Sequence, residues 1–136
     1  MAANTIVLGS YLGNIVVSDT SVNATAQNNV TGAGSTVLSL EIDNTANTST
    51  MVFFKMYDNN NASVGTTAPV FVLPVQGGKK LVYTSADGFV FSNAVSYGCT
   101  TGAGNSDTTA PSQAVTLLLI ASRSGGGLAA CRLLLQ

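Results

Sequence analysis

The sequence predicts an all-β protein, folded as a single β-sandwich of about seven to nine antiparallel strands that is either jelly-roll-like or immunoglobulin-like. Apolar residues recur at every second position in several short segments, which is the period of a half-buried strand. Stretches rich in Gly, Asn and Asp separate these segments. No segment has a convincing helical period apart from an ambiguous C-terminal tail. At 136 residues, the chain is long enough for one domain with a substantial core.

The first three predicted strands cover residues 5–8, 14–18 and 36–43. Alternation is clearest in the third, "TVLSLEID", and it predicts two faces. One face carries Leu38, Leu40 and Ile42, and the other carries Val37, Ser39, Glu41 and Asp43. We therefore expect the first set to face the core.

The middle of the chain alternates in the same way. The predicted strand 51–57 places Val52, Phe54 and Met56 opposite Phe53, Lys55 and Tyr57. In the predicted strand 80–84, Leu81 and Tyr83 share a face. We count 89–91 as an optional short strand and 94–99 as a further strand.

The tetrapeptide Thr-Thr-Ala-Pro occurs twice, at 66–69 and 108–111, each time before an apolar run. A residue that precedes proline is forced into extended geometry, so Pro69 and Pro111 are predicted to start strands 70–75 and 114–121. Pro74 marks the first of these as an edge strand, since proline cannot donate to a ladder. The second is apolar almost throughout and is predicted to be the most buried, central strand.

Loops are predicted wherever turn-forming residues cluster, at 31–35, 44–50, 58–65, 76–79, 86–88 and 100–107. Lys79 and Lys80 follow the turn "QGG". We interpret them as a charged flank that protects a strand edge.

Charged residues make up 8% of the chain, against about 25% in typical domains. The surface is instead supplied with 16 Thr, 14 Ser and 12 Asn, and the mean hydropathy is +0.35 with a net charge of −1. We therefore expect other protein to cover part of this surface. Five scattered basic residues are too few for a nucleic-acid partner, and no apolar run is long enough to predict a membrane span. The N-terminal segment does not resemble a signal peptide.

No residue cluster indicates catalysis, and we expect no enzyme activity and no cofactor. The chain contains no His, which excludes His-based triads and His-ligated metals. Glu41 and Asp43 are interpreted as ordinary solvent-facing acids. Asp58 with the three following Asn residues has the oxygen ligands of a calcium loop, but it lacks the spacing and the downstream Glu, which favours a solvated hairpin loop. Cys99 and Cys131 are predicted to be free buried thiols, with a disulfide between them as the alternative.

The central half of the chain resembles a module widespread in virion proteins of tailed bacteriophages. Its pattern is a strand ending in Lys-x-Tyr-Asp, a Val-Gly-Thr-Thr-x-Pro loop, a Gly-containing turn and a Ser-Tyr-x-x-Thr-x-Gly segment. The matching residues are Lys55, Tyr57, Asp58, Val64, Gly65, Thr66, Thr67, Pro69, Gly88, Phe91, Ser96, Tyr97, Thr100 and Gly102.

This resemblance implies a non-enzymatic structural protein of the virion, with no catalytic residues to transfer. The first expectation is a capsid decoration (cement) protein on the capsid surface, assembled in the bacterial host cytoplasm. Its expected partners are the major capsid protein and copies of itself, as a homotrimer. The alternatives are a tail- or fibre-associated module that binds receptor glycans, and a secreted enzyme accessory or carbohydrate-binding domain.

The C-terminal tail departs from the module, and the chain is divided accordingly. Residues 1–35 are expected to form part of the sandwich or an arm, 36–121 the sandwich core, and 122–136 an apolar arm hinged at Gly125–Gly127. We hypothesise that this arm buries apolar residues on a neighbouring subunit or on the capsid; the alternative is an edge strand of its own sandwich. The candidate interface residues are Leu128, Cys131, Leu133, Leu134 and Leu135.

Overall fold

The computed structural model describes residues 3–7 and 15–123, and this part of the chain contains eight strands and no helix. The strands are β1 (Asn4–Val7), β2 (Ile15–Val22), β3 (Ser35–Asp43), β4 (Val52–Tyr57), β5 (Phe71–Val75), β6 (Lys80–Phe91), β7 (Ser96–Thr100) and β8 (Val115–Arg123). They form a five-stranded sheet of order β1-β2-β8-β3-β6 and a three-stranded sheet of order β5-β4-β7. All the pairings are antiparallel. The predicted antiparallel β-sandwich is confirmed.

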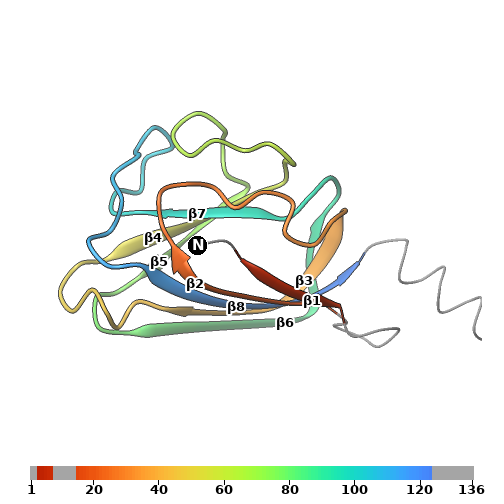
Figure 1. Cartoon of the computed structure of the whole chain (residues 1–136), viewed down its shortest axis with the longest axis horizontal. Helices are drawn as coiled ribbons and strands as arrows, with labels where there is room; N and C mark the ends of the chain where they lie inside the picture. Colours follow the sequence, from red (N-terminus) through yellow and green to blue (C-terminus); the bar gives the residue numbers. More distant parts are fainter. Residues whose placement is uncertain (1–2, 8–14, 124–136) are drawn as a thin grey trace, which may run out of the picture.

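The two sheets stack face to face, with the three-stranded sheet above the five-stranded sheet in Figure 1. Alternate residues of each strand point between the layers, as the period of a strand requires. The five-stranded sheet contributes Ile15, Val17, Val37, Leu40, Ile42, Leu117, Leu119 and Ala121 to the core. The three-stranded sheet contributes Val52, Phe54, Met56, Val75, Tyr97 and Cys99. Cys99 is a free buried thiol, and burial raises its pKa to about 12; Cys131 lies outside the described residues.

The predicted faces of β3 are wrong for two residues, Val37 and Leu38. Register slips between Val37 and Ser39 against both neighbouring strands, which makes Leu38 an extra residue in a β-bulge. Val37 therefore joins Leu40 and Ile42 in the core, and Leu38 is only partly buried. Strict alternation cannot anticipate a bulge, because one inserted residue exchanges the faces of everything before it.

Residues 80–91 form one strand rather than two strands and a turn. The predicted turn 86–88 lies within β6, whose residues 85–88 are the extra ones opposite the bulge in β3. Gly88 has φ of +74°, and a Cβ there would lie 2.4 Å from Cγ2 of Thr36. Glycine is required at this position because the backbone is left-handed and closely packed. Gly88 therefore lies in an irregular part of β6, not in a turn at the end of a strand.

The predicted positions of the two proline-started strands are confirmed. β5 is an edge strand with Pro74 exposed, and β8 is the central strand of the larger sheet. The prediction that β8 is the most buried strand is wrong, because its burial alternates and Leu118 remains 39% exposed. The strand buried at every position is instead β7.

β7 is buried on both faces because loops cover the outer face and the free edge of the small sheet. The segment after β2 pairs with it through Gln27 and Tyr97, which exchange backbone hydrogen bonds of 2.9 and 3.1 Å. Val64 in the β4–β5 loop lies so close to Gly98 that a Cβ there would be 2.6 Å from it. These loops lie above β7 and β4 in Figure 1.

The same cover buries Lys55 and Tyr57, whose side chains point away from the core on β4. Nζ of Lys55 donates to the carbonyl oxygen of Gly104 at 2.7 Å and thereby holds the loop after β7. Desolvation lowers the pKa of Lys55, and the charge of nearby Asp107 acts in the opposite direction.

Two buried asparagines tie the loops at one end of the sandwich. Nδ2 of Asn44 donates to the carbonyl oxygens of Thr50, Val75 and Gln76 at 2.9 to 3.2 Å. Asn47 donates to Oδ1 of Asn44 at 2.8 Å and exchanges hydrogen bonds of 2.9 Å with the backbone of Gln113. The loop after β3, the turn before β6 and the segment before β8 are therefore held together by side-chain amides.

Asp58 holds the start of the β4–β5 loop against the turn after β6. Its carboxylate accepts the backbone N–H groups of Ser92, Asn93 and Ala94 at 3.1, 2.7 and 3.2 Å. Burial acts to raise the pKa of Asp58, but these hydrogen bonds outweigh it and hold the pKa below its ordinary value. The three following asparagines are exposed, which confirms the interpretation of this segment as a loop.

One hydrogen bond inside the sandwich crosses between the sheets, and its energy can be tested with a matched pair of tyrosines. The hydroxyl of Tyr97 donates to Oδ2 of Asp19, which is 1% exposed, at 2.8 Å. Tyr97→Phe deprives this buried carboxylate of a donor, so we expect it to lower the free energy of unfolding by about 1 to 3 kcal/mol. The hydroxyl of Tyr57 is buried without a partner among the described residues. Tyr57→Phe is therefore expected to be neutral or stabilising in the same urea titrations; equal losses in both variants would contradict the assignment.

The stability contributed by Asp58 should depend on pH. Because its folded pKa lies below the unfolded value, the contribution is complete above about pH 4 and is lost as the pH falls through the folded pKa. Asp58→Asn keeps one acceptor oxygen, and we expect it to cost about 1 kcal/mol at pH 7. Urea unfolding at pH 7 and pH 3 should show the gap between wild type and variant closing at the lower pH. A gap of constant size would show that the carboxylate charge contributes nothing.

Candidate interaction surface

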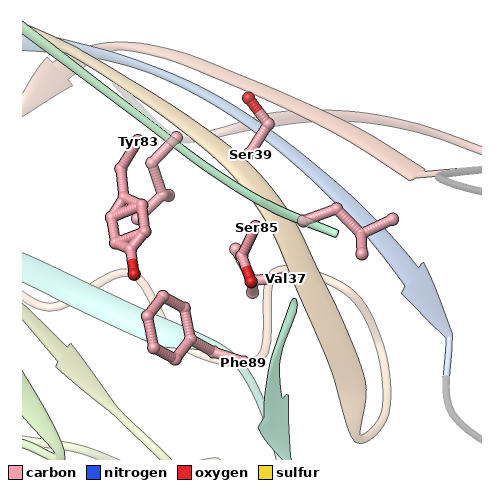
Figure 2. A pocket seen from close by; sticks show the side chains of 7 residues that line it. Val37, Ser39, Tyr83, Ser85 and Phe89 are labelled. Atoms are coloured by element: carbon pink, nitrogen blue, oxygen red, sulfur yellow. The ribbon is translucent and has the colours of Figure 1, made fainter. Parts of the chain in front are cut away.

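Two hollows of the sandwich can be described by their lining residues, and neither is an enclosed cavity of ligand size. The hollow in Figure 2 lies at the bulge between β3 and β6, where Tyr83 and Phe89 meet edge to face at 5.2 Å. It has no room for a water molecule. Its remaining lining residues are Val37, Leu38, Ser39, Leu40 and Ser85.

A second hollow, of about 280 Å³, lies beside the turn between β5 and β6. It is shallow, and the charged group most able to bind a ligand there, Lys80, already lies 3.4 Å from Glu41 and 3.8 Å from Asp43. Within residues 3–7 and 15–123, no three His, Cys, Asp or Glu side chains are grouped to hold a metal ion. No helix in these ranges is long and apolar enough to cross a membrane. The features of this part of the chain that could support recognition are therefore surfaces.

The outer face of the five-stranded sheet is the surface that the fold leaves open. No described segment covers it, whereas loops lie over the outer face of the other sheet (Figure 1). Register identifies its residues, since side chains directly opposite one another share a face. One row runs Ile6, Val16, Ile120, Ser39 and Thr84 across all five strands. The next row runs Asn4, Ser18, Leu118, Glu41 and Val82.

Apolar residues gather at two places on this face. Ile6, Val16, Leu118 and Ile120 form an apolar band over β1, β2 and β8, in which Ile6 is 49% exposed. Val82 and Val90, which we call the β6 valines, lie on the edge strand and are 62% and 68% exposed. The neighbouring side chains of the apolar band form a contiguous patch, whereas the β6 valines lie opposite Glu41 and Thr36 in register and are two separate exposed side chains.

Polar side chains of β3 separate the apolar band from the β6 valines. They are Thr36, Ser39, Glu41 and Asp43, with Glu41 directly between Leu118 and Val82. Lys80 pairs with the two carboxylates at one corner. Hydrogen bonds from Thr45, together with Lys80, hold the pKa of Asp43 below its ordinary value. This corner therefore carries one net negative charge near neutral pH.

The residues predicted from the sequence to make an interface belong to the C-terminal segment. Leu128, Cys131, Leu133, Leu134 and Leu135 are outside the described residues. The sequence interpretation missed the outer face, although a signal was present: "TLLLI" is apolar at successive positions, and in an alternating strand some of those side chains must point outward. Glu41 and Asp43 occupy this face as ion-paired surface acids, in agreement with the interpretation of them as solvent-facing.

Several residues of the phage-like pattern have identifiable structural tasks. Lys55 and Asp58 fasten loops, and Gly88 accommodates the bulge. Gly102 donates to Asp107 at 2.9 Å in the loop above β4. These contacts give each of these four residues a role in the fold, so a role in binding is not needed to explain them.

Comparisons with known protein families, curated proteins and solved structures find no match, so the function has to be argued from the open face of the sheet.

Proposed function

We propose that the protein is a non-enzymatic structural component of a tailed-phage virion, a decoration or cement protein that joins neighbouring major capsid proteins and associates as a homotrimer. The observation that carries the proposal is the open outer face of the five-stranded sheet, with its apolar band and its β6 valines. The phage-like pattern of the central half suggests the particle, and the surface suggests how the protein attaches to it.

The size of this face suits a protein partner. The five strands, which lie about 4.8 Å apart and have four to twelve residues rising about 3.3 Å each, cover roughly 700 Å². A standard interface buries about 800 Å² on each partner. With one net negative charge at its corner, the face imposes a small cost for desolvating charge on contact.

The rest of the molecule suits a stiff connector. Loops above the small sheet are fixed by Lys55, Asp58 and the Asn44–Asn47 pair, so little conformational freedom remains to be lost on binding. A rigid body that binds only assembled shells adds its binding free energy to the work of separating capsomers.

The apolar band and the β6 valines are separated on the face, which fits a protein that has two kinds of neighbour. A cement protein in a trimer must contact both its own copies and the capsid. The β6 valines lie at the rim of the sheet, on an edge strand, and we assign them to the capsid. The band over β1, β2 and β8 is then available for a second copy.

The location on the particle can be measured directly. Particles purified from the host that encodes this chain should contain it in copy numbers comparable to those of the capsomers, by quantitative mass spectrometry. Immunogold labelling should be spread over the shell, and stripping the protein should lower the temperature at which the capsid releases DNA. A few copies confined to one vertex, with binding to host cells, would support the tail-associated glycan-binding alternative. Absence from particles would refute both.

The assignment of the β6 valines gives a variant test. In Val82→Asp/Val90→Asp, binding would desolvate two unpaired carboxylates, so we expect at least about a tenfold loss of affinity for stripped capsids. Asn60→Asp, in the exposed loop over the small sheet, adds charge away from the five-stranded face and should bind like wild type. Comparable melting temperatures would establish that all the variants are folded. Undiminished binding of the double variant in a sedimentation assay would place the capsid contact elsewhere.

A further inference from the structure

The end of β8 and the apolar band lie on the same strand of the open face. β8 is the central strand of the five-stranded sheet and carries Leu118 and Ile120 of the band. It ends at Arg123, opposite Ser35 in register. Residues 124–136 are therefore joined to the end of the central strand, the same strand that carries Leu118 and Ile120 of the band.

The position of β8 restricts where those thirteen residues can pair. β2 pairs with β8 as far as Ala121 and β3 pairs with it as far as Arg123, so the paired length of β8 offers residues 124–136 no free edge. The free edges of this sheet are β1 and β6, two strands away on either side. Thirteen residues can extend about 43 Å, which exceeds the width of roughly 24 Å that five strands occupy. The segment is long enough to reach a neighbouring molecule.

The chemistry of the segment complements the band and its border. Residues 124–136 include Leu128, Leu133, Leu134 and Leu135, and their only charged side chain is Arg132. The border of the band has an excess of one negative charge, from Glu41 and Asp43 against Lys80. Glu41 is directly opposite Leu118, so apolar contact and an ion pair are available together.

We propose that residues 124–136 of one copy bind the apolar band of a second copy, on the outer face of its five-stranded sheet. This inference rests on the proposed self-association and names the surfaces that produce it. The contact is heterologous, because a C-terminal segment meets a sheet face, and three such contacts related by a threefold axis close a ring. Each copy then gives one segment and receives one, which accounts for a homotrimer.

The two natural cysteines make this contact measurable. Cys131 lies within the segment. Cys99 is fully buried, and burial raises its pKa to about 12. Its thiol is therefore protonated and inaccessible at pH 8, and we expect it not to form disulfides in the folded protein. A cysteine introduced into the band can therefore pair with Cys131 or with the same introduced cysteine of another copy, and peptide mapping distinguishes the two disulfides.

The experiment is mild oxidation of the purified full-length Leu118→Cys variant, followed by non-reducing gel electrophoresis. Docking between copies predicts covalent dimers and trimers that disappear on reduction. Ile6→Cys, on the edge strand β1, is a second variant in case Leu118→Cys folds poorly, and it should give the same ladder. Asn60→Cys introduces an equally accessible thiol in the loop above the small sheet and should remain largely monomeric. Adding Cys131→Ser to either band variant should abolish the ladder.

The alternatives give different products. A monomer carrying an internal 118–131 or 6–131 disulfide, identified by peptide mapping, would show that the segment binds its own sheet and would overturn the proposal. Band variants that crosslink no more than Asn60→Cys would overturn it as well. Neither result bears on the presence of the protein in particles, which the copy-number measurement decides independently.

Discussion

The unequal cover of the two sheets is the constraint on which the rest of the structure depends. A sheet of three strands has a small face that loops can close, and three loops do so, which buries β7 at every position. A sheet of five strands presents a larger face, and no described segment closes it. The chain thus covers the outer face of the small sheet with its own loops and leaves the outer face of the large sheet exposed. This exposed face is the surface available for recognition.

Buried polar side chains hold the loops and strands of the sandwich in place through hydrogen bonds. Lys55 reaches a loop carbonyl, Tyr97 links its sheet to Asp19 of the other, and Asn44 with Asn47 joins three segments. Each group is expensive to bury unless it is paired, so each fixes the loop or strand that satisfies it. This explains how a chain with so few charges defines its loops. Side-chain amides and single charged side chains fix the loops of this protein through hydrogen bonds to the backbone.

Most of the architecture was predictable from local patterns, and the exceptions have long-range causes. Period-two alternation located β3 and β4, and the prolines located β5 and β8 and identified β5 as an edge. The bulge at Leu38 was not predictable, because it is set by pairing with β6 and β8. The same long-range pairing makes Gly88 part of a strand. The burial of Lys55 depends on a loop some fifty residues later in the chain, and the outer face could be recognised only once register had aligned Ile6 with Val16 and Ile120.

The apolar residues of this chain fall into two groups: those of the core, and those of the outer face and the C-terminal segment. The mean hydropathy of +0.35 reflects a core that any sandwich of this size requires, together with apolar residues on an outer face and in a C-terminal segment. Had the outer face been needed only for solubility, Thr and Ser would suffice at positions 6, 82 and 118, as they do at 39 and 84 on the same face. Polar residues on β3 instead separate the apolar band from the β6 valines. This separation suits the proposed subunit, which has one neighbour of its own kind and one of another kind.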